Sequence, residues 1–392
     1  MQSNCTWLAG CEPNAQGHAT NVRSFAIAML CFVLAFGSSS CDTESATDPT
    51  PPTLPEQLDA ILRDTLQTHG GTGVSAAVLM PDRQWIGASG RSHGPVPISP
   101  QMLFGVSSVT KVYVAALTLR LAEEGRLTLA DSLHEWLPSY PHVDSTITIR
   151  QLLGHTSGLY DFVTYPNVWD SILYDPTRLW SPEEIVTSFV GEPCFAPGTE
   201  FHYSNTDYLL VGMIIEAATG GRVSSALRSR FWDPLDLSMT FLDAEEVITG
   251  DLAHAWIDIG NDGVLDDFST IPRTAVSSAT WTAGAILSTA EEFAEWGRAL
   301  YGGAVLDDVS LAQMLTDGGS GYGLGTDLML GHDLFNGEQA VGLAGSGVGY
   351  ASVLAYLQDF DVSIGVLMND NNLDCLFAVA AALAAAVIDH LS

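Results

Sequence analysis

A serine and the sequence's single lysine are spaced so that they could do chemistry together. Lys111 is the only lysine, and the other 13 of the 14 basic residues are arginines, whose guanidinium stays protonated and cannot serve as a base. A desolvated lysine can lose its proton. Ser108 stands three residues before Lys111, and on a helix this spacing places both side chains on one face, with Cβ atoms about 5 to 6 Å apart. The pair predicts a serine nucleophile activated by a neighbouring amine, as in acyl transfer.

A plainer interpretation of the same two residues stays open. Lys111 can be a surface residue of a helix and Ser108 the residue that caps it. Under the chemical interpretation, the free N–H groups and the positive dipole end of that helix would stabilise a serine alkoxide and the oxyanion formed by its attack. Spacing alone does not choose between the two.

The elements around this pair predict the fold class. Apolar spacing and turn residues indicate helices near both ends and through the middle of the chain, and strands close to both ends. We expect helices over 56–69, 112–125, 148–153, 181–190, 206–219, 290–300 and 376–391, two strands within 73–90, and two more within 338–368. This order predicts an α/β fold of the α+β type. An antiparallel sheet flanked by helices would be built from the N- and C-terminal segments, with a mainly helical lobe inserted at about 125–285.

The first 55 residues carry export features. Residues 24–37 form an apolar run too short for a membrane span, which follows a basic residue and precedes small residues, as in an export signal over 1–40. The small residues lead into Cys41, which resembles the acylated cysteine of a bacterial lipoprotein; simple secretion is the alternative. Residues 41–55 are acidic and proline-rich and predict a disordered tether before a folded domain at 56–392. We therefore expect a protein of the periplasm or cell envelope, anchored to a membrane by lipid or else secreted.

Charge and cysteine content exclude some classes of protein. The formal net charge of −32 would repel a phosphate backbone, which excludes nucleic-acid binding, and disfavours strongly anionic substrates. Cys194 and Cys375, which follow the signal, either pair or remain two buried thiols. The segment 258–267 partly resembles a calcium loop but lacks two expected ligands, so a hairpin turn is favoured. We expect no metal and no cofactor, a small-molecule or peptide substrate, and leave the oligomeric state open.

Ser108-x-x-Lys111 is also the first motif of the penicillin-binding proteins and serine β-lactamases. The surrounding sequence resembles the branch that holds class C β-lactamases, D-alanyl-D-alanine carboxypeptidases and related esterases. Segments similar to that family follow in order through about residues 56–390, at 124–131, 136–138, 148–159, 195–198, 201–205, 284–289 and 322–325. The resemblance implies a β-lactamase/transpeptidase-like fold and a serine hydrolase that acts through an acyl-enzyme.

The resemblance also implies roles for further residues. Tyr203 and Asn205 match the second catalytic motif, Tyr-x-Asn. Tyr203 would share or relay the proton and protonate the leaving group, and Asn205 would bond the acyl side of the substrate. Either Lys111 or Tyr203 can be the base. His155 is left out of the chemistry, because the family uses the matching residue structurally.

The third family motif is altered in this sequence. Leu343 stands where the family has a basic residue that binds the carboxylate of a β-lactam or of a terminal D-alanine. Leucine can neither hydrogen-bond nor neutralise that group. Gly345 would still permit close approach, and the N–H of Ser346 could join that of Ser108 as an oxyanion hole. One interpretation brings His332 to the site from another strand, but a solvated loop histidine is the commoner case.

These observations favour hydrolysis of a small ester or amide by Ser108. Two alternatives remain: a true D-alanyl-D-alanine carboxypeptidase or β-lactamase, whose substrate carboxylate would need an arginine that the sequence does not place, and a catalytically silent binding domain of the cell envelope. The intact Ser108, Lys111 and Tyr203 speak against the silent domain, and the altered segment at Leu343 speaks for it.

Overall fold

The computed structural model describes residues 51–335 and 337–392, which form a mixed fold of helices and antiparallel strands. The helices are α1 (Leu54–His69), α2 (Thr110–Glu123), α3 (Leu133–Trp136), α4 (Ile149–Leu153), α5 (Val168–Leu173), α6 (Pro182–Phe189), α7 (Asn205–Thr219), α8 (Val223–Leu227), α9 (Thr274–Gly284), α10 (Ala290–Tyr301), α11 (Asp308–Met314), α12 (Leu330–Leu334) and α13 (Leu373–Leu391). The strands are β1 (Gly73–Leu79), β2 (Gln84–His93), β3 (Val96–Pro97), β4 (Phe104–Gly105), β5 (Phe241–Leu242), β6 (Trp256–Ile257), β7 (Asp266–Asp267), β8 (Ile286–Ser288), β9 (Ala340–Ser346), β10 (Ala351–Leu357) and β11 (Val362–Met368).

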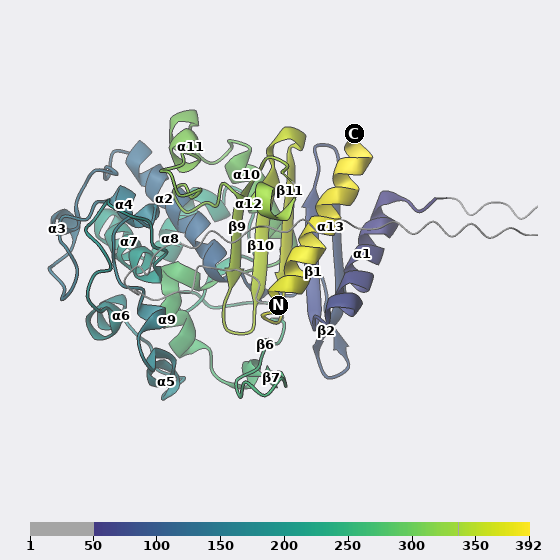
Figure 1. Cartoon of the computed structure of the whole chain (residues 1–392), viewed down its shortest axis with the longest axis horizontal. Coiled ribbons are helices and arrows are strands. Elements are labelled where there is room, and N and C mark those ends of the chain that lie inside the picture. The colour runs from purple at the N-terminus through teal and green to yellow at the C-terminus, as the bar shows by residue number, and fades with distance from the viewer. Residues whose placement is uncertain (1–50, 336) are drawn as a thin grey trace, which may run out of the picture.

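A six-stranded sheet joins the two ends of the chain. Its order is β3-β2-β1-β11-β10-β9, and every pairing is antiparallel (Figure 1). The first and last long strands meet in its centre, where Val74 of β1 lies opposite Met368 of β11. This confirms the predicted fold class.

The C-terminal part of the sheet holds three strands where the sequence predicted two. A 3₁₀ turn at Gln358–Phe360 separates β10 from β11, so the segment 338–368 holds β9, β10 and β11. Asp361, with φ of 51°, completes that turn in the left-handed region. The turn contains no glycine or proline, which is why the sequence did not reveal it.

Helices cover both faces of the sheet. Residues of β1 alternate, so that Val74, Ala76 and Val78 pack with α1 and α13, while Ala77 and Leu79 face the side that carries α10. Of the helices in the described ranges, α13 alone is long and apolar enough by composition to cross a membrane, a test that buried core helices also pass. It lies along the sheet with a continuous buried face (Figure 1).

The inserted region is mainly helical and lies beside the sheet, on the left in Figure 1. A small three-stranded sheet, β4-β8-β5, connects this lobe to the segment before Ser108. The segment 258–267 forms the predicted hairpin, with β6 paired to β7. The carboxylate of Asp258 accepts the backbone N–H groups of Asp262 and Gly263, and within the described ranges no group of three acidic, histidine or cysteine side chains is arranged to hold a metal ion.

Several expectations for the chain ends fall outside the described residues. These are the export signal at 1–40, lipidation of Cys41 and the tether up to residue 50. Cys375 is a free, buried thiol, so a disulfide between Cys194 and Cys375 is not formed.

Candidate active site

Ser108 lies on a tight turn that feeds into a buried helix. A 3₁₀ turn over Ser107–Val109 precedes α2, in which every residue from 110 to 119 is buried. Ser107, immediately before the nucleophile, has φ of 50°, in the left-handed region that costs most residues energy. This turn leaves Ser108 half-buried at the wall of a large cleft.

The amine of Lys111 is fully buried and has three hydrogen-bond partners. Its Nζ lies 3.3 Å from Ser108 Oγ, 2.8 Å from Asn205 Oδ1 and 2.7 Å from the Ala283 carbonyl oxygen. The amide oxygen and the carbonyl oxygen can only accept hydrogen bonds. In the ammonium form the third proton is donated to Ser108 Oγ. In the neutral amine those two partners would hold the two protons and leave the lone pair toward the serine hydroxyl. The predicted contact between Ser108 and Lys111 is thus present, and it can serve a general base when the amine is neutral.

Burial shifts the protonation of this amine. Desolvation lowers the pKa of Lys111 from 10.5 to about 7, and the negative charges of Asp161 and Asp207 only partly oppose that shift. A substantial fraction of the amine is therefore neutral at neutral pH.

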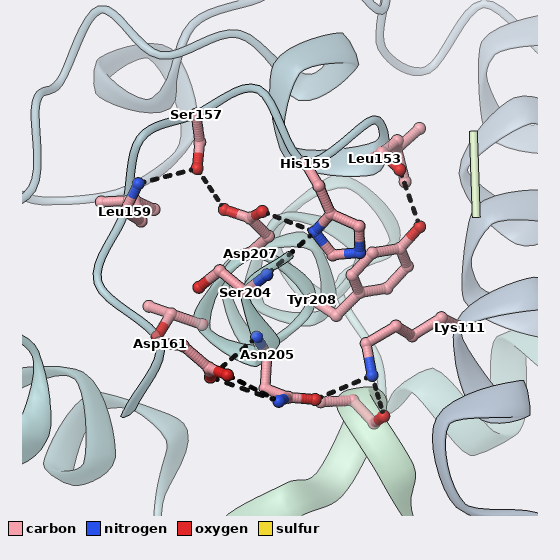
Figure 2. Close-up of polar contacts among 12 residues, drawn as sticks. Lys111, Leu153, His155, Ser157, Leu159, Asp161, Ser204, Asn205, Asp207 and Tyr208 are labelled. Carbon is pink, nitrogen blue, oxygen red and sulfur yellow. Dashed lines mark hydrogen bonds and ion pairs between the residues drawn. The ribbon is translucent and has the colours of Figure 1, made fainter. Parts of the chain in front are cut away.

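Asp161 fixes the orientation of Asn205, and the sequence did not single it out. Its Oδ1 and Oδ2 lie 3.2 and 3.1 Å from Asn205 Nδ2, and Oδ1 also accepts the Asn205 backbone N–H at 3.0 Å (Figure 2). With its nitrogen directed at Asp161, the Asn205 amide turns its oxygen toward Lys111. The two residues are 44 positions apart, and no local sequence signal links an aspartate to the first residue of a distant helix.

Tyr203 lies beside this centre, in the extended residues just before α7. The Lys111 Nζ is 4.9 Å from the centre of its ring, and Tyr203 lines the same cleft as Ser108. Burial raises the pKa of Tyr203, and its hydrogen bond with Ser108 opposes the rise without cancelling it. The phenol therefore stays protonated at neutral pH, which suits a proton donor better than a base.

His155 stands behind Tyr203 and does not line the cleft. Its ring is fully buried, 4.3 Å from that of Tyr203, and its Nδ1 lies 2.8 Å from Asp207, which also accepts the Ser157 hydroxyl (Figure 2). Burial lowers the pKa of His155 far below its usual value, so the ring is neutral. The Ser204 backbone nitrogen lies 3.3 Å from the same Nδ1, and the His155 carbonyl oxygen accepts the His202 N–H. These bonds hold the segment that carries Tyr203, in agreement with the predicted structural role.

Strand β9 runs against the nucleophile. A Cβ added to Gly345 would lie 2.7 Å from the Val106 carbonyl oxygen and 2.9 Å from the Ser108 backbone nitrogen, so only glycine fits. Leu343 and Ser346 line the cleft on either side of it. The structure thus brings the predicted β9 residues to Ser108, while their roles in binding remain predictions.

A strained residue positions the carbonyl that holds Lys111. Trp281 has φ of 33° and ψ of −115° inside α9, an unusual conformation for a bulky residue, and its indole N–H donates to Glu245. The helix kinks there, two residues before Ala283. The Ala283 carbonyl is therefore released from the regular helical pattern and reaches the amine.

The cleft has a volume of about 1410 Å³ and walls that are mostly apolar. Arg273, at the start of α9, is the only arginine among its lining residues in the described chain, and its Nε donates to Asp243 at 2.6 Å. His332 is exposed on α12 and does not line the cleft. The expectation that it is not part of the site fits this placement.

Comparisons with known proteins agree on one family. The family model described as Beta-lactamase matches residues 58–388. Among solved structures, a D-amino acid amidase from Ochrobactrum anthropi, in complex with L-phenylalanine, has 26% identity and a TM-score of 0.75, covering 86% of this chain and 99% of that one. A D-stereospecific amidohydrolase from Streptomyces has 27% identity and a TM-score of 0.70, covering 82% and 96%.

Curated relatives match over shorter stretches. Protein flp of Staphylococcus aureus is 29% identical over 196 residues, which are 47% of this chain and 38% of that protein. Penicillin-binding protein 4* of Bacillus subtilis is 31% identical over 147 residues, 37% of this chain and 31% of that protein. The match thus spans well under half the length of these relatives.

Proposed function

Because this chain belongs to the beta-lactamase family, we propose that it is a serine hydrolase that forms an acyl-enzyme on Ser108, with Lys111 as the general base. One observation carries the proposal: the buried amine lies 3.3 Å from Ser108 Oγ and has two further partners that can only accept, so in the neutral amine the lone pair would be directed at the Ser108 hydroxyl.

In the first half of the reaction the Ser108 proton passes to Lys111 Nζ as Oγ bonds to the substrate carbonyl carbon. The carbonyl oxygen becomes an oxyanion, for which the N–H groups of Ser108 and Ser346 are the proposed donors. Collapse of this intermediate breaks the bond to the leaving group. The leaving oxygen or nitrogen takes a proton from the Tyr203 hydroxyl, which regains one from the Lys111 ammonium. Water then attacks the acyl-enzyme by the same route, and Ser108 is restored.

The proposed substrate is an uncharged ester or amide. Leu343 offers no charge beside Ser108, and the one arginine of the cleft stands at the opposite end of α9 from Ala283. The Arg273 guanidinium is paired with Asp243, which offsets the positive charge that a substrate carboxylate would need. This argues against carboxypeptidase and β-lactamase action.

A D-amino acid amide is a second candidate substrate. The structure of the D-amino acid amidase, which holds L-phenylalanine, is matched over nearly its whole length. An amide of this kind lacks the carboxylate that Leu343 cannot bind. D-phenylalanine amide therefore belongs in the substrate panel beside neutral esters.

The deciding experiment compares three variants on p-nitrophenyl acetate and with a fluorophosphonate probe. We expect Ser108→Ala to lose labelling and about 10³-fold or more in kcat. Lys111→Arg keeps a charge but cannot supply a lone pair, and should lose about 10²- to 10⁴-fold. Ser225→Ala, an exposed position on α8, is the matched control and should retain both properties. Labelling that survives in Ser108→Ala would refute the proposal, and inertness of the unaltered protein toward all substrates would favour the silent binding domain.

We also propose export and lipidation at Cys41, on the sequence pattern alone. The test is membrane fractionation of cells that express the full chain, with metabolic labelling by palmitate. Cys41→Ser should abolish labelling and release the protein into the soluble fraction. Unchanged fractionation and labelling of Cys41→Ser would contradict this proposal.

A further inference from the structure

One face of α9 lines the active-site cleft along its whole length. Arg273, Val276 and Thr280 are spaced by three or four residues and all line the cleft, so they share one side of the helix, and Ala283, beyond the kink at Trp281, lines the cleft as well. Val276 and Thr280 are partly exposed, whereas Ala275 and Ala279 on the other side are buried. This arm of the cleft begins at the carbonyl that holds Lys111 and follows the helix back to Arg273.

Further apolar residues that line the cleft come from separate segments. Val163 and Trp169 belong to the region that follows Asp161, and Ile257, Phe268 and Ile271 belong to the β6–β7 hairpin and the loop after it. At the far end, Arg273 is paired with the buried Asp243, so the arm holds no uncompensated positive charge there. Such walls favour an uncharged hydrocarbon chain.

We propose that this arm binds an extended apolar acyl group, so that the substrate is an ester or amide of a medium- or long-chain acid. The acyl side is assigned because Asn205, which the resemblance assigns to the acyl side of the substrate, lines the same cleft as this face of α9. This inference rests on the proposed function and narrows its substrate class.

A series of p-nitrophenyl esters from acetyl to octanoyl tests the arm. Burial of each methylene favours binding by about three- to fourfold, so kcat/KM should rise at least about tenfold from acetyl to hexanoyl. Val276→Trp would fill the arm and should reverse the preference, lowering the octanoyl-to-acetyl ratio of kcat/KM about tenfold or more. Ile271→Trp, at another position that lines the cleft, should also lower the octanoyl-to-acetyl ratio of kcat/KM. With two such variants, the test does not depend on the correct folding of either one alone.

Val309→Trp is the matched control, because Val309 is 67% exposed on α11, and it should leave the ratio unchanged. The proposal would be overturned if the wild-type protein showed no preference for longer chains, or if the tryptophan variants lowered kcat/KM equally for both esters. Failure of the proposed function would look different: no ester would be hydrolysed in a Ser108-dependent manner.

A second inference concerns Asp161 and rests on separate contacts. We infer that Asp161 is a positioning residue, which keeps the Asn205 amide oxygen on Lys111 and thereby keeps the lone pair of Lys111 on Ser108. Its carboxylate receives the Asn205 side-chain nitrogen at 3.1 and 3.2 Å, and a reversed amide would place that nitrogen against the Lys111 protons. The reversed state would leave a buried donor without a partner.

The test is the pH profile of Asp161→Asn. This change should lower kcat about tenfold or more, because the Asn205 amide is no longer held in one orientation. It also removes a negative charge that raises the pKa of Lys111. The acidic limb of kcat/KM should therefore move to lower pH, with KM changed less than kcat. The other titratable groups that face Lys111 are unaltered in this variant: Asp207, His155, Tyr203 and Tyr208.

Asp175→Asn, at an exposed position in the same lobe, is the control and should leave the profile unchanged. If Asp161 were only structural, Asp161→Asn would lower activity in proportion to the loss of folded protein, and the acidic limb of kcat/KM would stay at the same pH. That outcome, or an unchanged kcat, would overturn the positioning role.

Discussion

Burial sets the protonation of Lys111 at the scale of one residue. Its pKa falls to about 7 in the folded protein, although the amine keeps three hydrogen-bond partners. The same contacts can hold the protonated amine, which then donates all three of its protons. The neutral and the protonated form of Lys111 therefore differ only in the proton that lies between Nζ and Ser108 Oγ. The base is thus poised close to physiological pH, where proton transfer is most efficient.

A pH–rate profile follows from this pKa. Because only the neutral amine can accept the Ser108 proton, kcat/KM should fall about tenfold per pH unit below about pH 7 and level off above it. The measurement uses a neutral ester with a buffer series of constant ionic strength. An acidic limb of kcat/KM near pH 10 would mean that the Lys111 amine is not desolvated. A kcat/KM that does not depend on pH would mean that Lys111 is not the base.

At the scale of elements, β9 can approach the turn at Ser108 closely because Gly345 has no side chain. Gly345→Ala would place a methyl group 2.7 to 2.9 Å from backbone atoms of Val106 and Ser108, so strand and nucleophile must separate. We expect a loss of about 10- to 100-fold in kcat/KM, since small displacements of a nucleophile are costly. Gly221→Ala, where an added Cβ meets nothing within 4 Å, is the matched control. Equal activity of the two variants would contradict the close approach.

Helix α10 carries an acidic group whose burial opposes folding. Burial, with repulsion from Glu291, Glu292 and Asp236, raises the pKa of Glu295 to about 7. The unfolded chain ionises this group near pH 4.5, so between pH 4.5 and 7 the folded state binds more protons, and stability is lost as the pH rises. Glu295→Gln should therefore raise the free energy of unfolding at pH 8 by about 1 to 2 kcal/mol, a figure reduced for partial exposure.

Denaturant unfolding at pH 4.5 and pH 8 measures this effect. The gain of Glu295→Gln should disappear at the lower pH, and Glu183→Gln at an exposed position of α6 should show little change at either pH. A gain of the same size at both pH values would indicate a cause other than ionisation.

On the scale of the whole molecule, the charge of −32 acts on substrates before they reach the cleft. An anionic ester such as a hemisuccinate is repelled at low salt, and raising the ionic strength from about 10 to 150 mM shortens the screening length from about 30 to 8 Å. The kcat/KM for the anionic ester should rise several-fold, while that for a neutral ester such as a butyrate changes little. Parallel responses of the two esters would show that the net charge does not steer substrate.

The sequence predicted the parts of this fold that depend on neighbours along the chain. Ser108 and Lys111 are three residues apart, and helices such as α1 and α7 follow local periodicity, so both were accessible. Asp161 and the Ala283 carbonyl were not, because they meet Asn205 and Lys111 only through tertiary packing. A backbone carbonyl leaves no trace in residue types, and its position depends on the kink at Trp281.

The central pairing of β1 with β11 has a consequence for when activity can arise. A chain that emerges from a ribosome with its N-terminus first delivers the nucleophile long before β9, the strand that abuts it. We therefore expect a chain that has not yet released β9 to be inert. Hydrolysis would begin only after β9, β10 and β11 have emerged and β11 has paired with β1.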